Sequence, residues 1–158
     1  MKIACLTFLF MVSVTAPAWA RLGESGDAVI ARYGQPLSEF DQKAEGGKIP
    51  LVKLTFQKNG YEIEVSLSDG ISAAESFKKM NGDPLTTGDA LTLLTANAQG
   101  LQWEAPQLLE NGVKRWTRDD GARATLSDDR IFYITTRQLM DAEKTAAEVT
   151  DKPTLDGF

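Results

Sequence analysis

The chain has 158 residues, one cysteine and no histidine, and its 17 Lys and Arg against 22 Asp and Glu give a net charge of −5. This length suits one domain or two small ones. The missing histidine excludes Ser-His-Asp and Cys-His catalytic groups and every His-ligated metal site. The acidic balance argues against non-specific binding to nucleic acid or anionic lipid.

The first twenty residues have the pattern of a cleaved secretory signal. Lys2 provides a short basic start, residues 3–14 are almost entirely apolar, and residues 18–20 (Ala-Trp-Ala) match the small-x-small pattern before a cut. The apolar run is too short for a membrane span, which needs about 20 residues. We therefore expect cleavage after Ala20, a mature protein that begins at Arg21, and a periplasmic or secreted location.

Cleavage would change the chemistry of the chain. Cys5 lies in the signal, so the 158-residue chain would lose 20 residues and keep 138 that hold neither cysteine nor histidine. Lys2 is the only charge removed, which makes the net charge −6. Without disulfides the mature protein must rely on its core, and folding buries roughly two-thirds of the chain surface at this length.

A short helix is expected over residues 26–34. Ser25 is a natural N-cap, and Gly34 followed by Pro36 provides a stop. The polar segment 38–50 contains a Gly-Gly pair and is expected to form a loop.

Alternation of apolar and polar residues next predicts strands. Residues 52–57 and 61–68 alternate in this way and are separated by an Asn-Gly hairpin turn. Segment 71–80 also has helical composition, but its position directly after an Asp-Gly turn favours a third strand.

The second half of the chain repeats this order. A helix from Gly88 to about Asn97 is expected, with Thr86 or Thr87 as its N-cap. Three short strands follow, at 113–118, 122–126 and 131–136. Residues 137–149 are polar and rich in Ala and Glu, which predicts a peripheral helix, and 151–158 are expected to form a flexible tail.

The two halves match as a degenerate duplication. Residues 25–28 (Ser-Gly-Asp-Ala) correspond to 87–90 (Thr-Gly-Asp-Ala), and each half continues with an Asn-Gly and then an Asp-Gly turn. The predicted fold is α+β, with one antiparallel sheet built from two helix-plus-hairpin units and both helices packed on one face. The predicted domain covers 21–137, with halves at about 21–80 and 81–137, and 138–158 form the peripheral helix and tail.

The motif in residues 25–29 (Ser-Gly-Asp-Ala-Val), followed by residues 33–36 (Tyr-Gly-Gln-Pro), resembles the small exported bacterial modules of the SmpA/OmlA type. The doubled version resembles the β-lactamase-inhibitor-protein architecture. SmpA/OmlA proteins are lipoproteins with a cysteine at the start of the mature chain, where this chain has Arg21, so membrane anchoring does not carry over. The resemblance implies a non-enzymatic binding or assembly role in the bacterial envelope.

The candidate binding residues lie in the second half and are Trp116, Arg118, Arg115 and Trp103. An aromatic residue among arginines on an open sheet face is typical of an interaction hot spot. The other interpretation is that Trp116 packs under the helix while the arginines pair with aspartates in neighbouring turns. The sequence leaves both interpretations open.

No catalytic, metal or cofactor site is predicted. Four aspartates are expected at hairpin turns, as turn chemistry requires, namely Asp69, Asp120, Asp128 and Asp129. Glu62 and Glu64 are expected on the wet face of a strand. The twelve-residue calcium loop and the phosphate-binding Gly-rich loop are both absent from the sequence.

The leading hypothesis is a non-enzymatic exported bacterial protein that binds another envelope or secreted protein, with no nucleic-acid partner, no membrane span and an open oligomeric state. The alternative is a small hydrolase that uses Asp/Glu or Ser-Lys chemistry. A solvent-facing sheet surface with arginines would favour binding. A cleft with perturbed carboxylates, or a buried Lys beside a Ser, would favour the enzyme.

Overall fold

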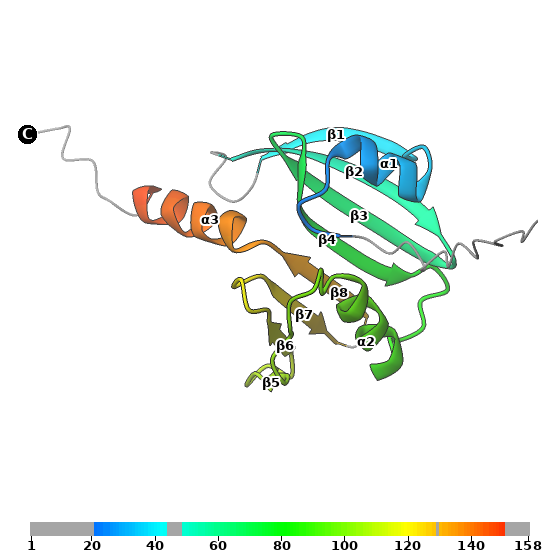
Figure 1. The fold of residues 1–158 in the computed structure, drawn as a ribbon, viewed down its shortest axis with the longest axis vertical. Helices are drawn as coiled ribbons and strands as arrows, with labels where there is room; N and C mark the ends of the chain where they lie inside the picture. Colours follow the sequence, from blue (N-terminus) through cyan, green and yellow to red (C-terminus); the bar gives the residue numbers. More distant parts are fainter. Residues whose placement is uncertain (1–20, 44–48, 129, 151–158) are drawn as a thin grey trace, which may run out of the picture.

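A computed structural model describes residues 21–43, 49–128 and 130–150 (Figure 1). The predicted signal over 1–20 and the predicted tail over 151–158 lie outside the described residues. The described chain forms three helices and eight strands. Their bounds are α1 Gly26–Tyr33, β1 Ser38–Lys43, β2 Pro50–Lys58, β3 Tyr61–Ser68, β4 Ile71–Lys79, α2 Thr87–Ala96, β5 Gln107–Leu108, β6 Lys114–Thr117, β7 Arg123–Ser127, β8 Ile131–Thr135 and α3 Arg137–Thr150.

All eight strands belong to one antiparallel sheet with the order β1-β2-β3-β4-β8-β7-β6-β5. Each group of four consecutive strands is a meander, and the last strand of one group pairs with the last strand of the other, β4 with β8 (Figure 1). The α+β class and the antiparallel sheet are therefore as predicted. Segment 71–79 is a strand, which confirms the favoured interpretation of that segment.

Local chemistry explains where α1 and α2 begin. Ser25 caps α1, because its Oγ accepts a hydrogen bond from the backbone N–H of Ala28. Thr86, rather than Thr87, caps α2, and its exchange of hydrogen bonds with Asp89 forms a capping box. Gly34 ends α1 with φ at +94°, a backbone conformation that favours glycine.

Two strands were not predicted. Residues 38–43 form β1 instead of part of a loop, and β5 is a two-residue strand that no pattern indicated. Both lie at the edges of the sheet, where one side of the strand faces water and polar residues are tolerated. The polar composition of 38–43 therefore reflects its edge position and not a lack of pairing.

The main core lies between the sheet and the first two helices. One apolar cluster joins Val29 and Tyr33 of α1, Leu93 of α2, and strand residues from both halves, including Ile63 and Phe132. Rings make contact inside it, with the centroids of Tyr33 and Phe56 lying 5.2 Å apart. Burial of this apolar surface is the main source of stability, at about 25 cal/mol per Å².

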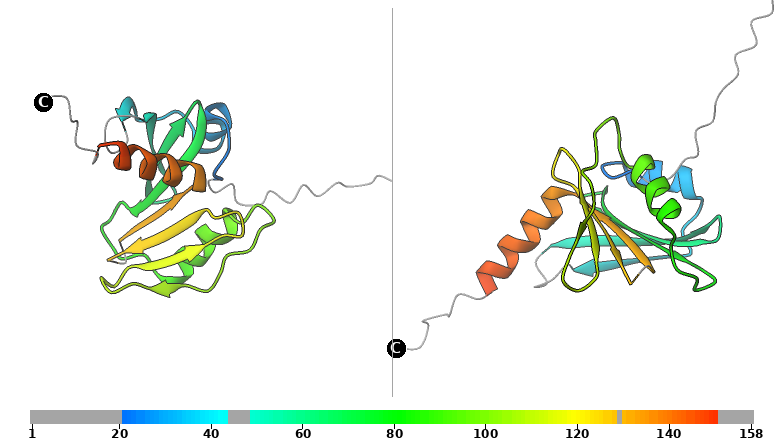
Figure 2. Two further views of the ribbon diagram at one scale, coloured as in Figure 1. Left: turned by 90° about the vertical axis from the view of Figure 1, so that its left-hand side faces the viewer. Right: turned by 90° about the horizontal axis from the view of Figure 1, so that it is seen from below.

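Helix α3 packs against the sheet separately. Leu139 of α3 contacts a small buried cluster with Leu51, Ala73 and Ala74. Leu51 and Ala74 alternate in their strands with residues that face the main core, so α3 covers the opposite side of the sheet at one end of the first half. The views in Figure 2 show α3 on the other side of the sheet from α1 and α2.

Candidate functional site

The strands have two faces, and we call the one that points away from α1 and α2 the open face. Along β6 and β7 the core side holds Trp116, Ala124 and Leu126, which are buried. The residues between them therefore point to the open face.

Trp116 lies in the core. Its side chain is 6% exposed, and its ring centroid is 6.1 Å from that of Phe132. Together with Ala90 and Leu91 of α2 it lines a small cavity of about 200 Å³ between the helix and the sheet. The packing interpretation describes its position, and Trp116 does not offer its ring to a partner as a hot-spot residue would.

Arg118 and Trp103 form a second structural cluster. The guanidinium of Arg118 is 3% exposed and lies 5.5 Å from the ring centroid of Trp103. It donates to both carboxylate oxygens of Asp120, at 2.9 and 2.7 Å, and to the carbonyl of Asn97. Arg118 lowers the pKa of the Asp120 carboxyl, although partial burial acts in the other direction. Each of the three guanidinium nitrogens of Arg118 thus donates to a partner within the fold.

Asn97 extends this cluster to the start of the described chain. Its side-chain carbonyl accepts from the N–H of Leu22 at 3.2 Å, and Gln99 donates to the carbonyl of Leu22 at 2.6 Å. Trp103 in turn donates its indole N–H to the carbonyl of Leu94 at 2.8 Å. These bonds tie the N-terminal segment to α2 and to the end of β6, which is a structural role.

Arg115 is the one predicted binding residue that lies on the open face. Its Nη2 donates to Gln107 at 2.8 Å, which steadies the side chain over β5 and β6. Thr125 of β7 is directly opposite Arg115, and Arg123 is directly opposite Thr117. We call these four residues the Arg-Thr quartet. Its two arginines lie on one diagonal and its two threonines on the other.

Arg115 is the only quartet residue that the sequence predicts to be a binding residue. The alternation along 114–118 could have separated Arg115 and Thr117 from Trp116, because neighbouring strand residues point to opposite faces. The contribution of Arg123 and Thr125 depends on the register between β6 and β7, which the sequence does not reveal.

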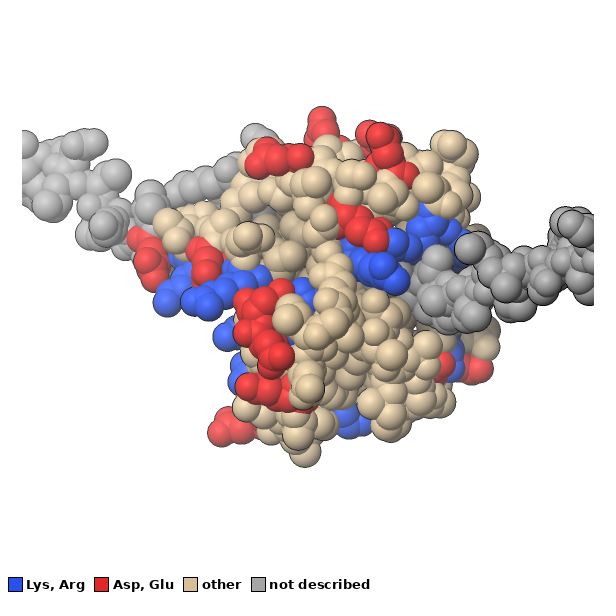
Figure 3. Space-filling view, in the orientation of Figure 1, with Lys and Arg blue, Asp and Glu red and all other residues tan. Residues whose placement is uncertain are grey.

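Charge is balanced differently on the two halves of the open face. On the first half, Lys53 pairs with Glu64 at 3.2 Å and Lys78 pairs with Glu62 at 2.7 Å. On the second half, the open-face positions of β5–β8 hold Arg115 and Arg123 but no Asp or Glu. Within the described residues, neither arginine has an acidic partner. On the side of the molecule seen in Figure 3, by contrast, basic side chains lie beside acidic ones.

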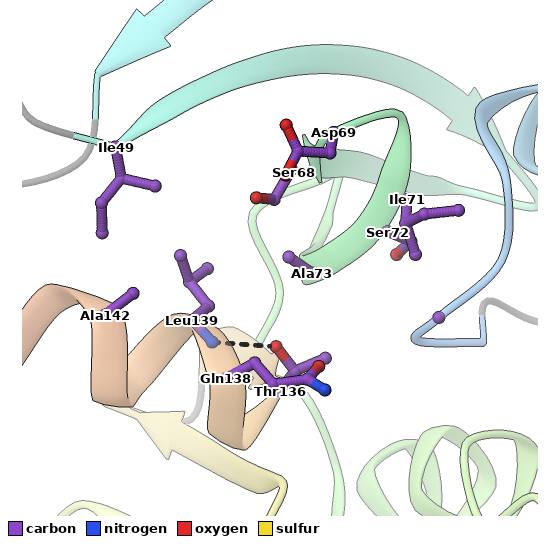
Figure 4. A pocket seen from close by; sticks show the side chains of 11 residues that line it. Ile49, Ser68, Asp69, Ile71, Ser72, Ala73, Thr136, Gln138, Leu139 and Ala142 are labelled. Atoms are coloured by element: carbon purple, nitrogen blue, oxygen red, sulfur yellow. Dashed lines mark hydrogen bonds between the residues drawn. The ribbon is translucent and has the colours of Figure 1, made fainter.

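The first half of the open face also carries α3. A cavity of about 440 Å³ lies between α3 and the start of β4 (Figure 4), and Ile49, Leu139 and Ala142 point toward it. Among the described residues that line it, Asp69 is the one charged side chain, and Ser68 and Thr136 contribute hydroxyl groups.

One carboxyl group has a strongly raised pKa. Glu75 of β4 is 1% exposed, and burial raises its pKa to about 8 even though Ser72 donates a hydrogen bond to it at 2.9 Å. Arg32 is nearby but is engaged with Glu24 in an ion pair. Glu75 points to the core side of β4, and it is also among the residues that line a cavity of about 220 Å³.

Neither a metal-binding group of acidic side chains nor a membrane-spanning helix is found among the described residues. Among residues 21–43, 49–128 and 130–150, no group of three or more Asp or Glu side chains is placed to hold a metal ion. Within the same part of the chain, no helix has the length and apolar character to cross a membrane.

Comparisons with known proteins give partial structural matches. No protein-family model and no curated protein matches the chain. Among solved structures, it is similar to a cysteine-rich secretory protein from Staphylococcus aureus, with 10% identity, a TM-score of 0.42, and coverage of 75% of this chain and 44% of the other. An extracellular protein containing an SCP domain from Bacillus anthracis matches with 10% identity, a TM-score of 0.44, and coverage of 89% and 51%. The chain thus spans about half the length of each structure.

Proposed function

We propose that this chain is a non-enzymatic exported module that binds another envelope or secreted protein through the open face of its second half. The observation that carries the proposal is the Arg-Thr quartet, in a chain with a net charge of −5. Arg123 is exposed and Arg115 is half-buried, and within the described residues neither is paired with an acidic side chain. Arginine is enriched where proteins meet. Export rests on the signal pattern of residues 1–20.

We also infer that the sheet arose by duplication of a helix-plus-four-strand unit. Each half begins with a capped helix and continues into a four-stranded meander, and α1 and α2 contribute to the same apolar cluster. This inference agrees with the resemblance to doubled SmpA/OmlA-type modules. After a duplication, one half can keep the structural role while the open face of the other changes toward binding.

Capture from the native envelope tests the proposed function. The protein serves as bait in its wild-type form, as Thr125→Glu, and as Thr92→Glu. Thr125→Glu places a carboxylate beside the two arginines and lowers the charge of the quartet from +2 to +1, whereas Thr92 is exposed on α2 and serves as the control. We expect one reproducible partner with the wild type and with Thr92→Glu, and its loss with Thr125→Glu. Recovery of no reproducible partner, or equal recovery with Thr125→Glu, would overturn the proposal.

A further inference from the structure

We infer that the Arg-Thr quartet recognises an extended acidic segment of the partner protein, with carboxylate side chains at alternating positions. This inference rests on the proposed function and names the chemistry of the partner. It comes from the arrangement of four side chains on β6 and β7 and from the charges that surround them.

The spacing of the quartet sets the geometry of the ligand. Arg115 is opposite Thr125 and Arg123 is opposite Thr117, so the two arginines are diagonal neighbours on adjacent strands. Diagonal positions are about 7–8 Å apart. In an extended segment, residues i and i+2 are about 6.6 Å apart and point to the same side. An Asp or Glu at each of these two positions can therefore meet one guanidinium each.

The donors of the quartet suit carboxylates. A guanidinium forms two parallel hydrogen bonds with a carboxylate, and such bonds are shorter and stronger than those between neutral groups. Thr117 and Thr125 place two hydroxyl groups beside the arginines on the same face. Gln107 holds Arg115 in place from the neighbouring strand, which lowers the entropy that binding would cost.

Two acidic groups in the β6–β7 turn are engaged within the fold, and a third nearby acid, Glu143, lies on α3. In the β6–β7 turn, Asp120 is paired with Arg118, and Asp119 accepts a hydrogen bond from the N–H of Gln102 at 3.0 Å. Burial raises the pKa of Tyr133 on β8, and the charge of Glu143 on α3 also raises it. Arg137, the first residue of α3, pairs with Asp141 at 3.4 Å.

A long polyanion fits this surface less well than an acidic protein segment. Nucleic acids and sulfated polysaccharides need a continuous track of cations, and the quartet provides two. The overall charge of −5 repels a long, uniformly charged chain more than a short segment with two carboxylates.

A peptide titration tests the inference. The probe is a nine-residue blocked peptide with three glutamates that alternate with serines, and the control peptide has glutamines in their place. Binding to the full mature chain is followed by amide shifts in NMR spectra. We expect a dissociation constant of about 1 mM, because exposed ion pairs are weak, shifts centred on β6 and β7, and a loss of affinity with added salt.

Amino-acid substitutions test whether the peptide binds at the quartet or is attracted non-specifically by positive charge elsewhere on the protein. Arg115→Gln with Arg123→Gln is expected to weaken binding about threefold to tenfold. Lys78→Gln with Lys144→Gln removes the same amount of charge from two exposed residues outside the quartet and serves as the matched control, with less than twofold change expected.

Three results would overturn the inference: no shifts with the glutamate peptide, equal binding of the glutamine peptide, or equal binding by the Arg115→Gln, Arg123→Gln variant. Quartet-dependent binding of heparin without binding of the peptide would also overturn it in favour of a polyanion. If one of these results occurs while Thr125→Glu still abolishes partner capture, the inferred acidic segment is wrong but the proposed binding function stands. If the wild-type protein also captures no partner, both the inference and the proposed function are wrong.

Discussion

The two halves of the sheet share one topology but differ in how they use their side chains. The first half has strands of six to nine residues, ion pairs on its open face and α3 packed against that face. The second half has strands of two to five residues, and within the described residues the arginines of the quartet are not paired with acidic side chains. Long, paired and covered strands suit a scaffold, and short strands with uncompensated arginines suit a surface that binds.

The helices differ in the same way. Asp27, the second residue of α1, is exposed, whereas Asp89, the third residue of α2, joins three elements. Asp89 accepts hydrogen bonds from Tyr61 and Lys79, both at 2.8 Å, and from Thr86. The second helix is thus fastened to strands of the first half, and this link holds the two halves together across the sheet.

The largest expected effect is on the core of the second half. Trp116→Ala should lower the free energy of unfolding by about 3–5 kcal/mol, because it removes a buried ring that packs on Phe132. Chemical denaturation followed by circular dichroism measures this. Trp116→Phe keeps part of the packing and should cost less. A loss below about 1 kcal/mol for the alanine variant would contradict the core position of Trp116.

The second-largest expected effect is on the pH dependence of stability, through the buried carboxyl of Glu75 in the first half. The folded-state pKa of Glu75 is raised to about 8, so its contribution to stability is fully present below pH 4.5 and is lost as the pH rises toward 8. Glu75→Gln cannot ionise, so the stability of the wild type should fall relative to this variant by on the order of 3 kcal/mol between pH 4.5 and 8.5.

Denaturation curves across this pH range measure the difference. Glu148→Gln, at an exposed position of α3, is the matched control and should follow the wild type. If the free energies of unfolding of the wild type and of Glu75→Gln change with pH in the same way, the pKa of Glu75 is not raised in the folded protein, and the prediction is wrong.

The third-largest effect on the free energy of unfolding is expected at Asp89, which links α2 to strands of the first half. Asp89→Ala removes the capping box and the bonds to Lys79 and Tyr61, with an expected cost of about 2 kcal/mol at pH 7. Partial burial opposes ionisation of Asp89, but hydrogen bonds from Lys79, Thr86 and Tyr61 outweigh it and lower the pKa of the carboxyl. This contribution is present above pH 3.8 and is lost as the pH falls through the lowered pKa.

Asp27→Ala is the matched variant in α1 and should cost only a few tenths of a kcal/mol, since an exposed acid acts there mainly on the helix dipole. Thermal or chemical denaturation of both variants tests the difference between the helices. Equal costs at the two positions would remove the proposed link between the halves.

The smallest expected effect is on the quartet itself. Arg115→Gln with Arg123→Gln should change the free energy of unfolding by no more than about 0.5 kcal/mol, because Arg123 is exposed, Arg115 is only half-buried, and neither is paired with an acidic side chain within the described residues. A loss of 2 kcal/mol or more in denaturation experiments would assign the arginines to the fold and not to binding.

The sequence predicted those elements whose residues carry local chemistry. Helix and hairpin ends are set by Ser25, Gly34 and the Asn-Gly turns. The sequence alone therefore predicts α1, β2 and β3. β1 was missed because an edge strand needs no apolar alternation, and its pairing with β2 is a long-range contact.

The candidate site was predicted less well, for a related reason. Trp116 and Arg118 stand out by residue type, yet both are buried on the core side of the sheet. Thr117 and Thr125 carry no signal of their own, and they become part of a site only when β6 and β7 pair in register. A binding surface on a sheet is formed by neighbours across strands, which a single sequence does not list.

Site-specific photo-crosslinking in the native envelope tests the central claim most directly. A photoreactive residue at Thr125 probes the open face of the second half, and the same residue at Thr55 probes the open face of the first half. The account predicts a discrete adduct with a partner protein from Thr125 and little or none from Thr55. Adducts from Thr55 alone, or equal adducts from both positions, would contradict the division of the sheet into a scaffold half and a binding half.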